Sequence, residues 1–341
     1  MEQLTLVEQG KIEWHDVPAP RLEGPGEALV EPLAVSRCDI DLPYVTGMLP
    51  PPRPFALGHE CVGRVAAVGD GVTSVRVGDR VIVPFQISCG RCPRCARGHT
   101  GSCEAVPFLS AFGLPLQPRE WGGALSDLIR VPFADAMLVP APARVPAWTL
   151  AAAADNATDG WRCVAPYLAE RPGASVFVVA GMAPSIGLYA ADAALALGAE
   201  RVDVLSPNPD VLRIAERIGA HPIEAGFGGK YGPYPITIDA AVDPTALDLA
   251  IRSTDHEGVC VSPVYYFGPA TPVPLGRMYT KGIRLHAGRC HARHELPAVA
   301  RAIAERRLHG DVIACRRVAW SDAAQAMAEP AVKLVVDRET A

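Results

Sequence analysis

The 341-residue sequence has no large excess of charge of either sign, which bears on its partners. Lysine and arginine together number 32, against 37 aspartates and glutamates, so the formal net charge is −5 at pH 7. A chain with this balance has no electrostatic attraction to polyanions. We therefore expect no nucleic-acid partner.

The sequence also lacks an uninterrupted apolar run that could cross a membrane. The stretch Ala174–Ala199 is long enough, but Pro184, Asp192 and several glycines interrupt it, so it predicts a strand, a loop and a helix. The first residues show no basic segment followed by an apolar one, which is the pattern of a secretory signal. We expect a cytoplasmic protein without a membrane partner.

No internal repeat or low-complexity tract is evident, but the character of the sequence changes along the chain. The length suits about two domains. The first 150 residues have all-β character, with short alternating runs such as ECVGRVAAVGDGV and GDRVIVPF. From about Thr149 to Phe267, apolar strands alternate with longer helical stretches, as in βαβ units. The last stretch contains an amphipathic helical pattern, HELPAVARAIAERRLHG, and a strand, KLVVDRE.

The ten cysteines, without a signal peptide, argue against disulfides because the cytosol keeps thiols reduced. Four of them have the spacing C-x2-C-x2-C-x7-C: Cys89, Cys92, Cys95 and Cys103. Thiolates at this spacing can surround one tetrahedral zinc and leave no ligand position open, so we expect a structural zinc. Three arginines alternate with them: Arg91, Arg94 and Arg97. We interpret these arginines as a solvated face that balances the charge of the thiolates, rather than as the nucleic-acid contact of a zinc ribbon.

Cys38 and His59, in the segments VSRCDID and FALGHE, are further candidate zinc ligands. A thiolate and an imidazole on separate loops can hold a zinc and leave a coordination position for substrate. Taken alone, each signal is weak, because a lone cysteine or histidine usually belongs to the core or surface. We assign a core position to three other cysteines in apolar segments, Cys163, Cys260 and Cys315.

An ordered series of motifs connects these residues. It consists of Cys38, GHE at 58–60, GDRV at 78–81, the four cysteines, WGG at 121–123 and the later βαβ unit. The series resembles the zinc-containing medium-chain dehydrogenase/reductase family, over nearly the whole chain. The resemblance implies an α/β protein with a β-rich GroES-like catalytic domain in residues 1–148 and 285–341. Residues 149–284 would form a Rossmann domain, with a doubly wound parallel sheet, that closes over the active-site cleft.

The resemblance also implies a catalytic zinc held by Cys38, His59 and Asp155. The family's third ligand lies five residues before a glycine, and Gly160 points to Asp155 in this sequence. Water, substrate or Glu60 would fill the fourth position. Such a zinc acts as a Lewis acid that lowers the pKa of an alcohol or polarises a carbonyl. The alternative role for Asp155 is to cap the helix that follows.

The nucleotide-binding loop departs from the family's pattern. The strand SVFVV is followed by AGMAPSIG, where Pro184 stands in place of a middle glycine. Amides at the start of a helix bind a pyrophosphate, and proline suits the first turn although it has no N–H. We therefore expect cofactor binding with an altered phosphate contact. The candidate residues are Gly181, Ala183, Pro184, Ser185, Ile186 and Gly187.

The preference between NAD and NADP depends on Ser206, at the end of the second strand of this unit. NAD enzymes have an acidic residue there that binds the ribose hydroxyls. Without that carboxylate a 2′-phosphate is not repelled, so we expect NADP or NAD with a slight preference for NADP. No arginine follows directly, and Arg213, one turn further on, is the candidate phosphate contact.

The proton relay that is usual in the family is missing. Ile40 and Pro43 stand where a Ser or Thr and a nearby His are expected. We hypothesise that Asp159, four residues after Asp155, acts as the general acid or base instead. The alternative is that Asp159 caps a helix.

Together these features predict a zinc-dependent oxidoreductase with one catalytic and one structural zinc. It would transfer hydride between NAD(P)(H) and a small or medium alcohol or carbonyl compound, as a homodimer or homotetramer. Two alternatives stay open, because a fold does not determine a reaction. One is a redox-neutral or biosynthetic tailoring enzyme on the same scaffold, and the other is a non-catalytic NADPH-binding protein.

Overall fold

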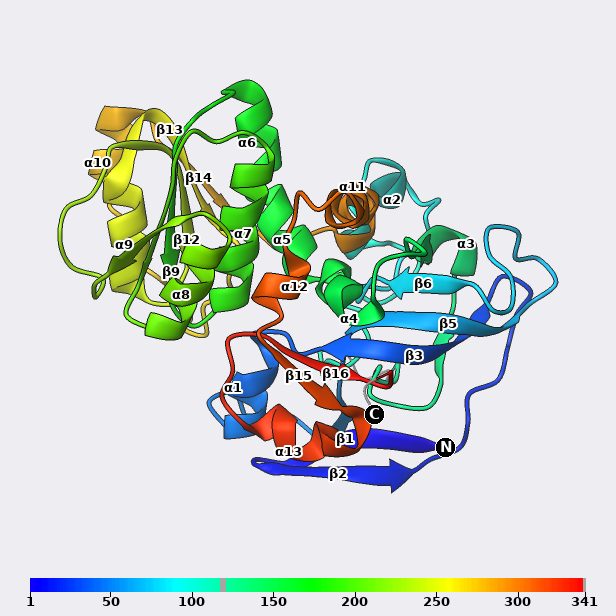
Figure 1. The fold of residues 1–341 in the computed structure, drawn as a ribbon. Helices are drawn as coiled ribbons and strands as arrows, with labels where there is room; N and C mark the ends of the chain where they lie inside the picture. The colour runs from blue at the N-terminus through cyan, green and yellow to red at the C-terminus, as the bar shows by residue number, and fades with distance from the viewer. Residues whose placement is uncertain (117–120, 340–341) are drawn as a thin grey trace. The chain divides into compact units, whose positions relative to one another are not determined.

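The computed structural model describes residues 1–116 and 121–339, and the chain divides into two compact units. The first unit comprises Met1–Thr158, His291–Glu305 and Ala314–Ala341, and the second comprises Asp159–Cys290 and Arg306–Ile313. Each unit is therefore assembled from segments that are separate in the sequence. Figure 1 shows the first unit to be rich in strands, whereas the second has helices alongside one sheet.

The first unit is built on two sheets. Its strands are β1 (Glu2–Glu8), β2 (Lys11–Asp16), β3 (Ala28–Ser36), β4 (Phe55–Ala56), β5 (Glu60–Val68), β6 (Arg80–Val83), β7 (Ile129–Val131), β8 (Val139–Pro140), β15 (Arg316–Ala319) and β16 (Leu334–Asp337). The small sheet has the order β2-β1-β4, and the large one β15-β16-β3-β5-β6-β8 with β7 beside β3. All neighbours are antiparallel except β15 and β16.

Short helices and turns connect these strands. They are α1 (Asp41–Thr46), α2 (Pro93–Ala96), α3 (Ala134–Met137), α4 (Ala147–Leu150), α11 (Ala292–Ala304), α13 (Ala323–Ala328) and the 3-10 turns η1 (Thr100–Ser102), η2 (Ala151–Ala154) and η3 (Trp320–Asp322). The core lies between the sheets, where apolar residues of β1, β3 and β5 are buried, among them Leu4, Val30 and Val65.

Strand pairing brings three distant segments to one end of the large sheet. Ser36, the last residue of β3, pairs with Glu60, the first residue of β5. On its other side Ser36 pairs with Val335 of β16. Residues that follow β3, precede β5 or precede β16 therefore lie beside one another. Cys38, His59 and Lys333 occupy these positions.

The second unit contains a six-stranded sheet in which every pair is parallel. In spatial order its strands are β11 (His221–Glu224), β10 (Val202–Ser206), β9 (Val176–Ala180), β12 (Tyr234–Ala240), β13 (Thr254–Ser262) and β14 (Arg284–Ala287). Its helices are α6 (Ala165–Glu170), α7 (Pro184–Ala196), α8 (Pro209–Arg217), α9 (Pro244–Ser253), α10 (Leu275–Lys281) and α12 (Gly310–Ile313), and α5 (Asn156–Arg162) spans the boundary between the units. This is the doubly wound Rossmann order, so the predicted fold class is confirmed.

The apolar stretch Ala174–Ala199 forms the centre of this unit. All five residues of β9 are buried, as expected for a parallel strand covered on both faces. Helix α7 follows after a short loop and packs against β9, β10 and β12. The predicted strand, loop and helix are thus confirmed. None of the helices formed by residues 1–116 and 121–339 is long and apolar enough to cross a bilayer.

The prediction that Cys315 belongs to the core is wrong. Cys163 and Cys260 are fully buried, but Cys315 is exposed. It lies directly before β15, and β15 is at the edge of the large sheet with β16 as its one neighbour in the sheet order. An edge strand leaves part of its flank in solvent, so the apolar sequence context did not guarantee burial.

Gly58, which precedes His59, provides a test of how the fold positions that residue. Its φ is 90°, and an added Cβ would lie 2.8 Å from the backbone nitrogen of Leu125. Gly78 has a similar φ of 94°, but a Cβ there would meet nothing within 4 Å.

We expect Gly58→Ala to destabilise the protein more than Gly78→Ala does. Left-handed strain should cost about 1–2 kcal/mol at either position, and the close contact should add about 1–3 kcal/mol at Gly58. The free energies of unfolding would be measured by urea titration. Equal losses of unfolding free energy in the two variants would show that the contact between Gly58 and Leu125 adds no cost.

Candidate functional site

The four cysteines form one compact lobe in the first unit. The sulfur atoms of Cys89, Cys92, Cys95 and Cys103 lie within 4.8 Å of one another. Backbone N–H groups donate hydrogen bonds to these sulfurs over 3.3 to 3.5 Å. Such bonds, with that from Glu104 the strongest, lower the pKa of Cys92 to about 6, whereas burial raises the pKa of Cys95 and Cys103. A cluster of four sulfurs fits a tetrahedral zinc with no open position.

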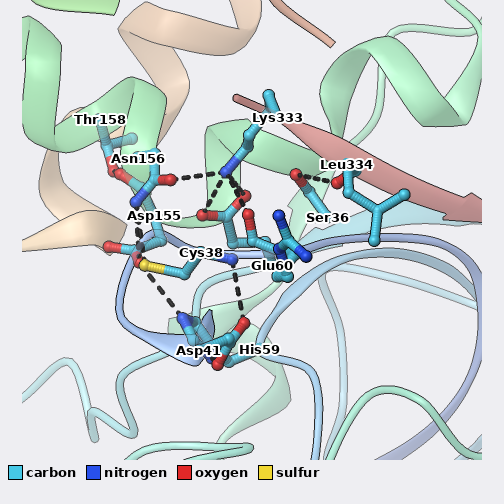
Figure 2. Close-up of polar contacts among 11 residues, drawn as sticks. Ser36, Cys38, Asp41, His59, Glu60, Asp155, Asn156, Thr158, Lys333 and Leu334 are labelled. Carbon is cyan, nitrogen blue, oxygen red and sulfur yellow. Dashed lines mark hydrogen bonds and ion pairs between the residues drawn. The ribbon is translucent and has the colours of Figure 1, made fainter. Parts of the chain in front are cut away.

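A second group, which we call the central cluster, consists of Cys38, His59, Glu60 and Asp155. One ligand atom from each lies within 4.8 Å of those from the others, and all four residues are buried. Cys38 follows β3, His59 and Glu60 stand at the start of β5, and Asp155 lies between η2 and α5. Figure 2 shows these side chains pointing toward one another.

Asp41, on α1, faces the imidazole of His59. Its Oδ1 lies 3.6 Å from Nδ1 of His59, and its Oδ2 accepts a hydrogen bond from the backbone N–H of Cys38 at 3.0 Å. The other ring nitrogen, Nε2, lies 3.4 Å from Oδ2 of Asp155. Each ring nitrogen of this fully buried side chain therefore faces a carboxylate oxygen. A histidine that binds a metal commonly turns its other nitrogen to a carboxylate, so Nε2 fits a metal ion.

Buried carboxylates and buried basic side chains alternate around the central cluster. The carboxylates are Asp41, Glu60 and Asp155, and the basic side chains are Arg37, His59 and Lys333. Burial raises the pKa of Cys38 well above its usual range, and the carboxylates of Asp155 and Glu60 raise it further. Burial opposes a charge on His59, but Asp41 and Asp155 outweigh it and raise the pKa to about 9. A thiol, an imidazole and two carboxylates that converge within 4.8 Å are a donor set that zinc prefers, so the central cluster fits a divalent metal ion.

Glu60 is held by a buried ion pair. The Nζ of Lys333 lies 2.7 Å from Oε2 and 2.9 Å from Oε1 of Glu60, and both side chains are fully buried. Burial raises the pKa of Glu60 to about 7, against the opposing effect of the ammonium group. The carboxylate therefore stands beside the other donors with its charge matched by Lys333.

The start of the predicted cofactor loop is tied to strand β12 of the second unit. The N–H groups of Gly181 and Ala183 donate to the carbonyl of Ala240, at 3.0 and 3.1 Å, and that of Met182 donates to Ala241 at 3.1 Å. An added Cβ on Gly181 would lie 2.7 Å from Cβ of Ala241. This glycine therefore permits a close approach between the loop and the end of β12.

The rest of the loop forms the first turn of α7. Pro184 is the first residue of the helix, as its fixed φ favours, and Ser185 and Ile186 are buried. An added Cβ on Gly187 would lie 3.2 Å from Cβ of Ala240, so this glycine allows the helix to pack on the sheet. The loop lies at the carboxyl end of β9, where the strand order reverses and ligands bind in such sheets.

Ser206 and Arg213 both have partners within the second unit. The hydroxyl of Ser206, which is buried at the end of β10, accepts a hydrogen bond from the backbone N–H of Asn208 at 3.2 Å. The guanidinium of Arg213 is exposed and forms an ion pair with Asp210 one turn earlier on α8.

Asp159 forms an ion pair with Arg162 inside α5. Its Oδ1 accepts a hydrogen bond from Nε of Arg162 at 2.6 Å, and another nitrogen of the guanidinium donates to the carbonyl of Gly288. Burial opposes the charge of Arg162, but the carboxylate of Asp159 outweighs it and raises the pKa of the guanidinium. The guanidinium of Arg162 is therefore charged where it contacts Asp159.

Three residues around the central cluster were not identified from the sequence. Asp41 follows Cys38 by three residues, a spacing that could have drawn attention to it. Asn156 directly follows Asp155 and contacts both Cys38 and Lys333. Lys333 is far from the cluster in sequence, and a single lysine before a strand carries no signal of its own.

A four-cysteine lobe and a buried Cys-His-Asp cluster, in one chain with a doubly wound sheet, are typical of two-domain zinc-type dehydrogenases. Residues 24–143 match the alcohol dehydrogenase GroES-like domain. The chain is 32% identical over 216 residues to the medium chain reductase/dehydrogenase ucsI of Acremonium sp. This match covers 62% of this chain and 71% of that protein. The chain therefore belongs to the zinc-containing medium-chain dehydrogenase/reductase family, as the motifs predicted.

Two further proteins show the extent of the similarity. The glutathione-independent formaldehyde dehydrogenase of Pseudomonas aeruginosa is 33% identical over 260 residues, or 73% of this chain. The match spans 64% of that relative's length. Among solved structures, the alcohol dehydrogenase TADH from Thermus sp. ATN1 is 27% identical, with a TM-score of 0.85 and 99% of each chain covered.

We expect Asp41→Asn to weaken zinc retention at the central cluster about 10- to 100-fold, because an amide no longer supplies the charge that faces Nδ1 of His59. Zinc remaining after graded chelator dialysis would be measured by mass spectrometry. Asp135→Asn is the matched control, since Asp135 is an exposed carboxylate that accepts hydrogen bonds from Thr73 and Ser74. Zinc retention by Asp41→Asn equal to that of the control would show that the carboxylate does not support the site.

Proposed function

We propose that this chain is a zinc-dependent oxidoreductase that transfers hydride between NAD(P)(H) and a small or medium alcohol or carbonyl compound. The observation that carries the proposal is the central cluster, in which a thiol, an imidazole and a carboxylate converge in a buried site. Family membership supports the same reaction class. A formaldehyde dehydrogenase and an alcohol dehydrogenase among the similar proteins favour small alcohols and aldehydes as the first substrates to test.

In this proposal Cys38, His59 and Asp155 hold the catalytic zinc, and Glu60 stands beside it. When bound there, zinc supplies Lewis acidity that lowers the pKa of an alcohol or polarises a carbonyl. Asp41 orients the imidazole so that Nε2 is available. The four cysteines of the lobe hold a second, structural zinc.

The cofactor is proposed to bind at the Gly181–Gly187 loop. The amides of Gly181, Met182 and Ala183 already donate to carbonyls at the end of β12, so the helix N-terminus at Pro184 would be the main contact for the pyrophosphate. The uncharged Ser206 favours NADP(H), while the ion pair of Arg213 with Asp210 limits that preference.

Asp159 remains our candidate for the general acid or base, on the grounds of its place in α5. Its ion pair with Arg162 works against this role, because a carboxylate beside a guanidinium is a weak base. We propose further that the protein is a homodimer or homotetramer. Strand β14 is at the edge of the parallel sheet, and Leu275 and Tyr279 of the preceding helix α10 are 67% and 89% exposed.

Metal content and turnover together test the proposed function. We expect two zinc ions per chain in the unmodified protein and one in Cys38→Ala, with kcat/KM for an alcohol or aldehyde lowered on the order of 10²–10³-fold. Cys95→Ala is the matched variant for the lobe and should also lose one zinc. Metal would be measured by mass spectrometry, and turnover by NAD(P)H absorbance.

Two results would contradict the proposal in different ways. A single zinc in both the unmodified protein and Cys38→Ala would mean that the central cluster holds no metal. Two zincs with product formation but no net change in NAD(P)H would favour the redox-neutral alternative.

The cofactor preference is tested at Ser206. We expect the unmodified protein to bind NADP(H) more tightly than NAD(H), and Ser206→Asp to weaken NADP(H) binding about 10- to 100-fold through charge repulsion. Ser206→Ala controls for loss of the hydrogen bond to Asn208. Dissociation constants would be measured by fluorescence titration, and equal constants for the two cofactors in the unmodified protein would refute the preference.

A further inference from the structure

Asn156 occupies a fully buried position between Lys333 and two of the proposed zinc ligands (Figure 2). Its side-chain nitrogen Nδ2 donates to Sγ of Cys38 at 3.1 Å and to Oδ2 of Asp155 at 3.3 Å. Its oxygen Oδ1 accepts a hydrogen bond from Nζ of Lys333 at 2.5 Å. The amide nitrogen thus faces the sulfur and the carboxylate oxygen that would bind a metal, and the amide oxygen faces a cation.

This pattern allows one orientation of the amide. If the group were flipped, its oxygen would face the sulfur and the carboxylate, and its NH₂ would face the ammonium of Lys333. The contacts with Asp155 and Lys333 would then pair two acceptors and two donors, as would the contact with Cys38 once it is a thiolate. In a buried site such mismatches are costly, so the lysine determines which way Asn156 points.

Lys333 is itself held in place by three different partners. Besides Asn156 it donates to Oε1 of Glu60 at 2.9 Å and to the backbone carbonyl of Arg37 at 2.9 Å. An ammonium has three N–H groups, and these three acceptors match them. The carbonyl of Arg37 belongs to the residue that precedes Cys38, so the lysine also fixes the backbone beside that ligand.

We propose that Asn156, locked by Lys333, is a positioning residue for the metal site. It holds the sulfur of Cys38 and the carboxylate of Asp155 at their mutual distance before a metal enters. Its N–H···S hydrogen bond also draws electron density from the thiolate, which leaves a bound zinc more electrophilic. The inference rests on the proposed function, because it takes Cys38 and Asp155 as zinc ligands.

The test compares Asn156→Leu, which keeps the branched shape but removes the hydrogen bonds, with Asn156→Ala. Asn208→Ala is the matched control, because Asn208 caps α8 in the other unit. The full-length proteins would be loaded with zinc and challenged with a chelator, and in parallel loaded with Co²⁺ to record the thiolate-to-metal charge-transfer band. Thermal unfolding would report on the fold.

We expect both Asn156 variants to release one zinc about 10- to 100-fold more readily than the unmodified protein. The zinc of the four-cysteine lobe should be released as slowly as in the unmodified protein. The charge-transfer band of the Cys38 sulfur, identified as the band that Cys38→Ala loses, should shift in both Asn156 variants. Asn208→Ala should change neither quantity. A purely structural role would lower the unfolding temperature without moving that band.

Several outcomes would overturn the inference. If both Asn156 variants released zinc as the unmodified protein does and their charge-transfer band did not shift, the inference would be refuted and the proposed function would stand. Failure of both variants to fold would make Asn156 a structural residue instead. A single metal ion in the unmodified protein, held by the lobe, would refute the proposed function and this inference with it.

Discussion

The buried negative charge of the central cluster is the constraint on which the rest of the site depends. Asp41, Glu60 and Asp155 have at most 6% of their surface exposed. A carboxylate removed from water costs several kcal/mol unless a partner compensates it. Lys333 compensates Glu60, and the other two carboxylates face opposite sides of the His59 imidazole. A divalent ion would replace the proton of His59 as the positive charge among donors that already converge.

The pairing of β3 with both β5 and β16 is what makes this convergence possible. Ser36 pairs with Glu60 on one side and Val335 on the other, so a thiol, an imidazole and an ammonium come from three strand ends. The segment η2–α5 adds Asp155 and Asn156 from a helix start. Because Cys38, His59 and Glu60 lie at or within two residues of paired strand ends, backbone hydrogen bonding between those strands limits how far apart these donors can lie.

The second unit follows a different physical rule. Its parallel strands place Gly181 and Ser206 at their carboxyl ends, where a doubly wound sheet binds ligands. Pro184 fits this arrangement because the first turn of a helix needs no N–H at that position. The glycines on either side allow the loop and α7 to approach β12 closely. The departure from a glycine-rich loop is therefore compatible with the fold.

The sequence alone predicted the doubly wound unit, the four-cysteine lobe and the candidates Cys38 and His59, because these depend on residue type, spacing and periodicity along the chain. The resemblance of its motifs to the family added Asp155. The sequence did not place Cys315, whose exposure follows from an edge strand. Lys333 and the orientation of Asn156 were decided only by tertiary structure. Their roles come from buried hydrogen bonds between residues far apart in sequence. Such long-range partners leave no motif or periodicity in the sequence around Lys333 or Asn156.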